Sequence, residues 1–207
     1  MRVRVKICGI TSVADAERAA VLGADAIGLN FYAKSPRCID EATARQIVAV
    51  LPPFVEPVAL FVDETSDHIE QAARRLGIRS VQIHGDVAKI LPTSGLRLIP
   101  AFTVRDAASL QSIDAYLAKH TPAAILVDAH VPGLFGGTGQ IAPWQLLADF
   151  KPGVPLILAG GLTPDNVAEA IRIVQPYAVD VASGVESSPG KKDADKMRRF
   201  FDAVRNV

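Results

Sequence analysis

The feature that most constrains the fold is an eightfold alternation of strand-like and helix-like segments along the 207 residues. The predicted strands cover residues 3–8, 25–30, 56–62, 79–84, 96–102, 123–128, 154–160 and 178–183. Each is followed by a predicted helix, and these helices cover residues 12–23, 40–51, 66–77, 86–91, 104–120, 142–150, 163–174 and 193–206. Eight consecutive strand–helix units predict an α/β protein with a closed parallel (β/α)8 TIM barrel. Because no linker or low-complexity segment interrupts the alternation, we expect a single barrel domain over residues 1–207.

The competing architecture is a doubly wound open sheet, which also alternates strands with helices. That fold usually carries the pattern G-x-G-x-x-G directly after its first strand. Here residues 8–12 read CGITS and do not fit that pattern. The length also suits a barrel, since 207 residues lie near the lower end of the usual range of roughly 200 to over 400.

Composition and charge exclude several classes of function. Hydrophobic residues make up 49% of the chain, which is enough for a full core, and the formal net charge is zero. A neutral chain has no overall attraction to nucleic acid or to a membrane surface, so we expect neither as a partner. The sequence contains no signal-peptide pattern and no apolar run long enough to span a membrane. With only two cysteines, it has no disulfide framework, and we expect a soluble protein of the reducing cytoplasm.

Polar side chains gather at the carboxyl ends of the predicted strands. Side chains alternate between the two faces of a strand, so Lys6 and Cys8 share one face of residues 3–8 and point into a barrel. The same alternation brings further polar groups to the rim where barrels build active sites, namely Asn30, His84, Asp128 and Asp180. The alternative is that each of these groups only satisfies an internal hydrogen bond, and Lys6 with Asp180 or Asp128 forms a structural ion pair.

Two glycine-rich loops follow the seventh and eighth predicted strands, LAGGLTPDNV at residues 158–167 and ASGVESSPGKKD at residues 182–193. Loops at these two positions form the usual phosphate site of barrels, because glycine lets a phosphate approach the backbone N–H groups. The same glycines also suit ordinary turns. Lys191 and Lys192, at the end of the second loop, are compatible with plain solvated charges.

Three further features leave alternatives open. Arg37, on the loop after the second strand, has the planar donor group that clamps a carboxylate, although it also reads as a plain surface arginine. The segment GLFGGTG at residues 133–139 reads as a lid or as a simple connection. Cys8, His84, Asp128 and His130 are residue types that bind metals, but none of their spacings is diagnostic, so we expect no metal site.

The chain resembles the phosphoribosylanthranilate isomerases of tryptophan biosynthesis in six stretches, which together extend over nearly its whole length. These stretches are KICGIT (6–11), GLNFYAKSPR (28–37), VQIHG (81–85), VDA (127–129) with GGTG (136–139), LAGGLTPDNV (158–167) and VDVASGVESSPGKKD (179–193). The resemblance implies a (β/α)8 barrel that converts N-(5-phosphoribosyl)anthranilate to the 1-deoxyribulose phosphate by an Amadori rearrangement. It implies no metal and no organic cofactor, a small phosphosugar-anthranilate substrate, and a monomer or a homodimer.

The resemblance also implies roles for particular residues. The general base of the family matches Cys8, its general acid matches Asp128, and its anthranilate-binding arginine matches Arg37. The phosphate is expected at the glycine-rich loops, and the rim supplies two more candidates for substrate binding, which gives the set Gly160, Gly161, Ser183, Gly184, His84 and Asp180. The acid opens the aminosugar by protonating the ring oxygen, and the base then takes the proton from C2. A positive charge such as Lys6 would favour the thiolate of Cys8, and burial would favour a protonated Asp128.

The sequence departs from the family pattern at two places. GGTG continues as QIAPW, which keeps Trp144 but lacks the acidic residue of the family, and Ala182 with Ser183 stands where many members have two serines. Two other functions share parts of this pattern. A histidine-pathway phosphosugar isomerase would use two aspartates as acid and base, which Cys8 disfavours, and a catalytically silent sugar-phosphate-binding barrel would not need both Cys8 and Asp128.

Overall fold

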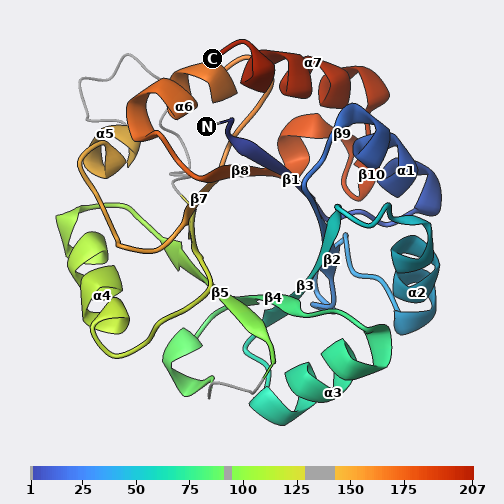
Figure 1. Cartoon of the computed structure of the whole chain (residues 1–207), viewed down its shortest axis with the longest axis horizontal. Coiled ribbons are helices and arrows are strands. Elements are labelled where there is room, and N and C mark those ends of the chain that lie inside the picture. The colour runs from blue at the N-terminus through green and yellow to red at the C-terminus, as the bar shows by residue number, and fades with distance from the viewer. Residues whose placement is uncertain (1, 91–94, 129–142) are drawn as a thin grey trace.

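The computed structural model describes residues 2–90, 95–128 and 143–207, and in it eight parallel strands close into a barrel (Figure 1). Strand β1 (Arg4–Cys8) pairs with β2 (Ala26–Asn30) on one side and with β8 (Ala178–Val181) on the other, which closes the ring. The strands between them are β3 (Glu56–Val62), β4 (Ser80–His84), β5 (Arg97–Thr103), β6 (Ile125–Asp128) and β7 (Leu156–Ala159). The strand order follows the chain, and the predicted (β/α)8 barrel is confirmed.

Helices surround this ring of strands (Figure 1). They are α1 (Val13–Leu22), α2 (Glu41–Val50), α3 (Ser66–Leu76), α4 (Ala107–Leu117), α5 (Pro143–Leu147), α6 (Val167–Val174) and α7 (Ala194–Arg205). The side chains that begin the helices explain several of these boundaries. The hydroxyl of Ser12 accepts a hydrogen bond from an N–H in the first turn of α1, and Asp40, Thr65 and Asp106 do the same for α2, α3 and α4. Gly23 ends α1 in the left-handed conformation, as expected for a helix C-terminus.

Several predicted helices are shorter than expected, among them residues 104–120, observed as α4 (Ala107–Leu117), and two others have a visible cause. The fourth is reduced to a 3-10 helix, η1 (Val87–Lys89), and Asp86 before it makes no side-chain hydrogen bond to its first turn. The seventh predicted helix, observed as α6, begins at Val167 rather than at residue 163. Asn166 accepts a hydrogen bond from the N–H of Thr163 and donates one to the carbonyl of Gly161, so its side chain closes a turn before the helix.

The segment after β8 contains elements that the sequence pattern did not predict. A 3-10 helix, η2 (Ser183–Val185), leads into a small antiparallel hairpin made of β9 (Glu186–Ser188) and β10 (Lys191–Lys192). Gly190 has a φ of +81° in the turn of this hairpin, and a Cβ there would lie 2.9 Å from the carbonyl oxygen of Pro36. The hairpin therefore packs closely against the loop after β2, and this contact shapes the site described below.

The core has two parts, one between the strands and the helices and one inside the barrel. Val5 and Ile7 belong to the outer part, which also includes Phe200 of α7. The inner part is built from the other strand face, with Leu126 and Ile157 among its members. The alternation of side chains predicted for the strands is therefore confirmed for β1 and β6, and it leaves Lys6 and Cys8 on the inner face of β1.

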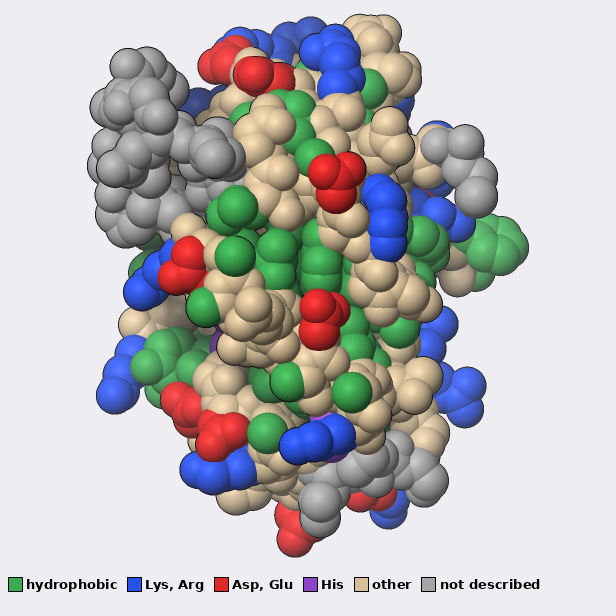
Figure 2. All heavy atoms as spheres, turned by 90° about the vertical axis from the view of Figure 1, so that its left-hand side faces the viewer, with side chains coloured by type: hydrophobic (Ala, Val, Ile, Leu, Met, Phe, Trp, Pro, Cys, Tyr) green, Lys and Arg blue, Asp and Glu red, His purple; other side chains and the backbone are tan. Residues whose placement is uncertain are grey.

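The molecular surface mixes charges of both signs. On the face drawn in Figure 2, Lys and Arg side chains lie among Asp and Glu side chains, so neither sign dominates it. Exposed ion pairs such as Arg75 with Glu41, at 2.6 Å, follow the same pattern. None of the helices within the described ranges is both long and apolar enough to cross a membrane.

The buried aromatic ring of Phe200 yields a prediction about stability. Phe200 is completely buried in the core, whereas the ring of Phe54 is 96% exposed. Phe200→Ala is expected to lower the free energy of unfolding by about 3–5 kcal/mol, because it leaves a cavity in a packed core. Phe54→Ala, the matched control, is expected to change it by no more than about 0.5 kcal/mol. Denaturant unfolding measures both, and equal losses would contradict this assignment of the core.

Candidate active site

A cavity of ≈ 280 Å³ opens at the carboxyl ends of the strands, and all the site residues expected from the sequence line it. Cys8 lies on β1, Arg37 on the loop after β2, His84 on β4 and Asp128 on β6. Gly160 and Gly161 follow β7, Asp180 lies on β8, and Ser183 and Gly184 follow β8. A larger cavity of ≈ 470 Å³ lies near the start of β5 and the end of α4, away from this rim. The first cavity places a thiol, an imidazole and two carboxylates together at the carboxyl ends of the strands, where barrels build active sites.

Lys6 and Asp180 form a buried ion pair inside the barrel. The two residues are direct neighbours in the register of β1 and β8, and Lys6 Nζ lies 2.9 Å from Asp180 Oδ1. Both side chains are less than one-tenth exposed, so each charge depends on the other in place of water. Of the two aspartates considered as partners of Lys6, Asp180 is the one that pairs with it.

Cys8 ends β1 with its thiol buried and facing the cavity. Gly28, its neighbour in the register of β2, provides the space for it. A Cβ at Gly28 would lie 2.7 Å from Cys8 Sγ and 3.1 Å from Lys6 Nζ, so only glycine allows both side chains to point inward here. The close approach at Gly28 thus serves the reactive side chains of β1.

The pKa of the Cys8 thiol is raised above its ordinary value, mainly because burial disfavours the charged thiolate. The positive charge of Lys6 lowers that pKa and the negative charge of Asp180 raises it, while Lys192 also lowers it. Lys6 therefore acts in the expected direction, but burial outweighs it. With its pKa raised, Cys8 is a thiol near neutral pH.

Strands β4 and β6 supply the other polar groups of the cavity. The ring of His84 lies with its Nε2 2.7 Å from the Nε2 of Gln82. Burial is the main cause that lowers the pKa of His84, and the charge of Lys6 adds to it, so the imidazole is neutral at pH 7. Asp128 ends β6 and is only partly buried.

Arg37 reaches the cavity from the loop after β2. Its side chain passes over Gly9, where a Cβ would collide with Arg37 Cδ and where φ is +69°. The guanidinium donates two hydrogen bonds to Glu186, from Nε to Oε1 at 2.8 Å and from Nη2 to Oε2 at 2.6 Å. The hydrogen bond with Glu186 is the main cause that raises the pKa of Arg37, so the guanidinium stays charged.

The loops after β7 and β8 lie against each other at the cavity. Gly160 and Gly161 have φ values of +90° and +64°, which favour glycine because other residues rarely adopt that backbone region. A Cβ at Gly184 would collide with the carbonyl oxygen of Leu162. Gly184 therefore allows the two backbones to approach each other, and all three glycines line the cavity.

Sequence reasoning missed Glu186 and misjudged Lys192. The side chain of Lys192 is fully buried rather than solvated, and its Nζ lies 2.8 Å from Glu186 Oε1. Burial raises the pKa of Glu186, but hydrogen bonds from Arg37 and Lys192 outweigh it, and the pKa falls below its usual value. Lys191, in contrast, is exposed, as expected. The sequence offers little sign of this pair. Glu186 lies six residues before Lys192 in a loop rich in turn residues, and that spacing is not diagnostic of an ion pair.

Some expected features lie outside the described residues. His130 and the loop at 133–139 belong to this group. Within the described ranges, no group of three or more His, Cys, Asp and Glu side chains is arranged to hold a metal ion.

Arg37 and the glycine loops suit negatively charged groups at two sides of the cavity, and Cys8 and Asp128 suit proton transfer between them. Fold and cavity together therefore define an acid–base enzyme of the (β/α)8-barrel class for a small anionic molecule. A family model described as N-(5'phosphoribosyl)anthranilate (PRA) isomerase matches residues 5–203. The chain belongs to this family. The match agrees with the resemblance seen in the sequence and not with the histidine-pathway alternative.

Individual relatives agree along the whole chain. The N-(5'-phosphoribosyl)anthranilate isomerase of Acidithiobacillus ferrooxidans is 48% identical over 207 residues, which cover 99% of this chain and 98% of that protein. The enzyme of the same name from Geobacter metallireducens is 49% identical over 200 residues, with 96% and 97% covered. The crystal structure of phosphoribosyl anthranilate isomerase from Thermotoga maritima matches with a TM-score of 0.84 and 38% identity, covering 99% of this chain and 100% of that chain.

The charges around Cys8 yield a prediction about its reactivity. An alkylating reagent attacks the thiolate, so the rate of alkylation rises with pH through the pKa of the thiol. Because the pKa of Cys8 is raised, the midpoint should lie above that of an exposed cysteine, about 8.5. Lys6→Met is expected to move it to higher pH by removing a positive charge, and Asp180→Asn to lower pH by removing a negative one.

These rates should be measured in a Cys38→Ser background, because Cys38 is exposed and would react as well. Mass spectrometry of the Cys8 peptide reports the modified fraction at each pH. A midpoint that moves in the same direction in both variants would contradict the balance of charges described here.

Proposed function

We propose that the chain converts N-(5-phosphoribosyl)anthranilate to 1-(2-carboxyphenylamino)-1-deoxyribulose 5-phosphate, with Cys8 as general base and Asp128 as general acid. The observation that carries the proposal is that one cavity collects both groups together with Arg37 and the two glycine-rich loops. Family membership supports the same reaction, which belongs to tryptophan biosynthesis. A phosphoribosyl anthranilate isomerase solved with reduced 1-(o-carboxyphenylamino)-1-deoxyribulose 5-phosphate is 37% identical to this chain over 99% of its length, with a TM-score of 0.83.

The two ends of the substrate fit two sides of the cavity. Arg37 binds the anthranilate carboxylate, since its guanidinium stays charged and has donors left after the two bonds to Glu186. The phosphate binds between the loops after β7 and β8, near Gly161, Ser183 and Gly184. The ribose then lies between these anchors, within reach of the polar side chains of β1 and β6.

Sugar hydroxyls have a candidate partner on β4. Gln82 is 2% exposed, and its Oε1 has no hydrogen-bond partner among the described residues. Burying an amide oxygen without a partner costs free energy, so a donor from the ligand would stabilise it. His84, beside Gln82, is neutral; its Nε2 accepts a hydrogen bond from the amide Nε2 of Gln82, which leaves the other ring N–H to donate one to a ligand.

The reaction requires two proton transfers. Asp128 donates a proton to the ring oxygen of the aminosugar, the C1–O bond breaks, and the nitrogen lone pair forms the C1=N bond of an iminium ion. Cys8 then removes the proton from C2, and the electrons of the C2–H bond form an enamine that tautomerises to the ketose. Cys8 must be a thiolate for this step, so its raised pKa implies that kcat/KM increases from neutral toward alkaline pH.

The proposal extends to the setting of the enzyme. We propose one barrel domain over residues 1–207, which is supported by the closing pair of β1 and β8 and by a hydrogen bond from Arg205 of α7 to the carbonyl of Leu22. We also propose that it works in the cytoplasm on a small phosphosugar, without nucleic acid or membrane as a partner. A monomer and a homodimer are both compatible with this proposal.

The roles of Cys8 and Asp128 can be tested by isosteric substitution. Cys8→Ser replaces the thiol by a hydroxyl that does not ionise near neutral pH, and Asp128→Asn removes the transferable proton. Each is expected to lower kcat by about 10²–10⁴-fold or more. Each variant should still bind reduced 1-(o-carboxyphenylamino)-1-deoxyribulose 5-phosphate, referred to below as the reduced product analogue. Fluorescence assays with freshly prepared substrate, beside analogue titrations, measure both quantities. Near wild-type turnover in Cys8→Ser would show that the base lies elsewhere.

The phosphate position can be tested at Gly161. Its φ of +64° is strained for any residue with a Cβ, and a branched side chain would hold a phosphate away from the backbone. Gly161→Val is expected to raise KM strongly, with a smaller effect on kcat. The comparison requires a variant that keeps the circular-dichroism spectrum of the wild type, and an unchanged KM in that variant would refute this placement.

A further inference from the structure

Lys192 is a buried cation with a complete set of partners. Its Nζ lies 2.8 Å from Glu186 Oε1 and donates hydrogen bonds to the carbonyl oxygens of Cys8, at 2.6 Å, and Ala182, at 3.1 Å. A lysine ammonium has three N–H donors, so these acceptors use all of them. Each bond fixes the ammonium in one direction, and together they hold it in a single position.

The three acceptors belong to three parts of the active site. The carbonyl of Cys8 is the end of β1, where the proposed base lies, and the carbonyl of Ala182 begins the segment that lines the phosphate side of the cavity. Glu186 in turn accepts two hydrogen bonds from Arg37, the proposed carboxylate clamp. One buried ammonium therefore connects the base, the phosphate loop and, through Glu186, the clamp.

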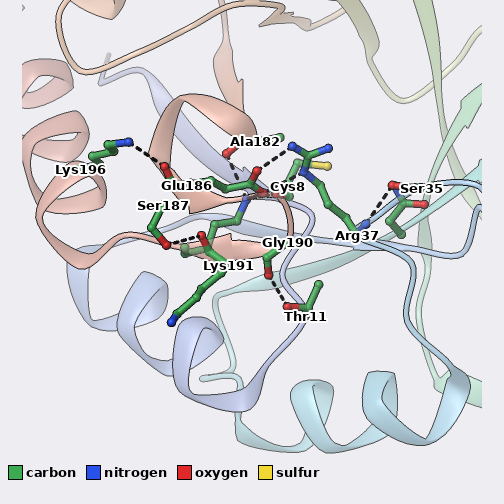
Figure 3. Close-up of polar contacts among 12 residues, drawn as sticks. Cys8, Thr11, Ser35, Arg37, Ala182, Glu186, Ser187, Gly190, Lys191 and Lys196 are labelled. Carbon is green, nitrogen blue, oxygen red and sulfur yellow. Dashed lines mark hydrogen bonds and ion pairs between the residues drawn. The ribbon is translucent and has the colours of Figure 1, made fainter.

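The Glu186 carboxylate also determines which edge of Arg37 remains for a ligand. Nε and Nη2 each donate to it, which uses two of the five guanidinium N–H groups and fixes the plane of the group. Figure 3 shows Arg37 and Glu186 facing each other, with Cys8 beside them. Arg37 lines the cavity, so the N–H groups on its other edge are available to a carboxylate there.

We propose, on the basis of the function given above, that Glu186 and Lys192 are positioning residues for this reaction. Glu186 orients Arg37 toward the carboxylate of the substrate. Lys192 holds Glu186, the end of β1 and the loop after β8 at fixed separations. The side chains of the site are then already ordered before the substrate binds, so less of the binding free energy is spent on ordering them.

The charges of Arg37, Glu186 and Lys192 agree with this positioning role. Arg37 and Lys192 carry two positive charges and Glu186 carries one negative charge, since its pKa is lowered. The group thus has one uncompensated positive charge, which the carboxylate of the substrate would neutralise. Without Glu186, two like charges would face each other across the gap that it now fills.

Other contacts already anchor the hairpin to the barrel. Thr11 donates from its hydroxyl to the carbonyl of Gly190 at 2.5 Å, and Lys196 donates to the backbone carbonyl of Glu186 at 2.7 Å (Figure 3). The backbone N–H of Lys192 donates to Asp15 at 3.3 Å. None of these bonds uses the carboxylate of Glu186, so attachment of the hairpin does not explain the two bonds between that carboxylate and Arg37.

The first test compares two ligands that differ only in the carboxylate. One is the reduced product analogue, and the other is the same compound made from aniline in place of anthranilate. Glu186→Gln is expected to weaken binding of the first by roughly 10–100-fold, by analogy with the loss seen when a partner that orients a metal ligand is removed. Binding of the second should change by less than about 2-fold, within the effect of an ordinary substitution. Equal weakening of both ligands, or of neither, would overturn the proposal.

Lys191→Ala is the matched control, because this neighbouring lysine is exposed. It should leave both affinities and kcat unchanged. A loss of affinity for the carboxylate ligand in this variant would indicate a general effect of charge in the hairpin and would overturn the assignment to the buried pair.

The second test separates positioning from stability. Glu186→Gln leaves Lys192 without its carboxylate partner, whereas the double variant Glu186→Gln/Lys192→Met removes both buried charges and is expected to regain thermal stability. Positioning predicts that the double variant still binds the carboxylate ligand at least about 10-fold more weakly than the wild type. If affinity returned together with stability, the pair would be purely structural. Should Glu186→Gln alone fail to fold, the two-ligand comparison on the double variant decides the question.

Turnover of the wild type separates this inference from the proposed function. Absence of isomerase activity in the wild type, with binding of the reduced analogue intact, would refute the proposed function and leave the two-ligand comparison valid. Activity in the wild type together with a negative two-ligand comparison would refute only the roles of Glu186 and Lys192.

Discussion

The structure depends on the closure of the strand ring, in which β1 forms hydrogen-bonded ladders on both of its edges. Pairing with β2 and β8 fixes the register, so Lys6 lies beside Asp180 and Cys8 beside Gly28. Because all eight strands are parallel, their carboxyl ends meet at one rim, and Cys8, His84, Asp128 and Asp180 line the same cavity there. Closure thereby converts residues far apart in sequence into one site.

Two buried ion pairs contribute to the electrostatics of Cys8. Lys6 with Asp180 lies below it inside the barrel, and Lys192 with Glu186 lies at the end of its strand. Each cation lowers the pKa of the thiol, but each is held by its own carboxylate, and burial dominates the balance. The site therefore keeps a neutral thiol next to two paired lysines, which limits the charge buried in the absence of substrate.

Glycines make room for these charged and reactive side chains. Gly28 gives space to the thiol of Cys8, Gly9 lies under the side chain of Arg37, and Gly184 allows the loop after β8 to contact the loop after β7. In each case a Cβ would collide with an atom of the site. These close approaches shape the wall of the ≈ 280 Å³ cavity at Cys8, Arg37 and Gly184.

The sequence by itself determined the eight strands, the barrel and the residues at its rim. Strands and helices have a periodic side-chain pattern, and the glycine-rich loops are recognised by their composition and their place after a strand. It also contained the motifs that identify the family. Only the tertiary structure decided that Lys6 pairs with Asp180, that burial raises the pKa of Cys8, and that Glu186 joins Arg37 to a buried Lys192. These outcomes depend on desolvation and on contacts between residues such as Arg37 and Glu186, 149 positions apart, which no local pattern encodes.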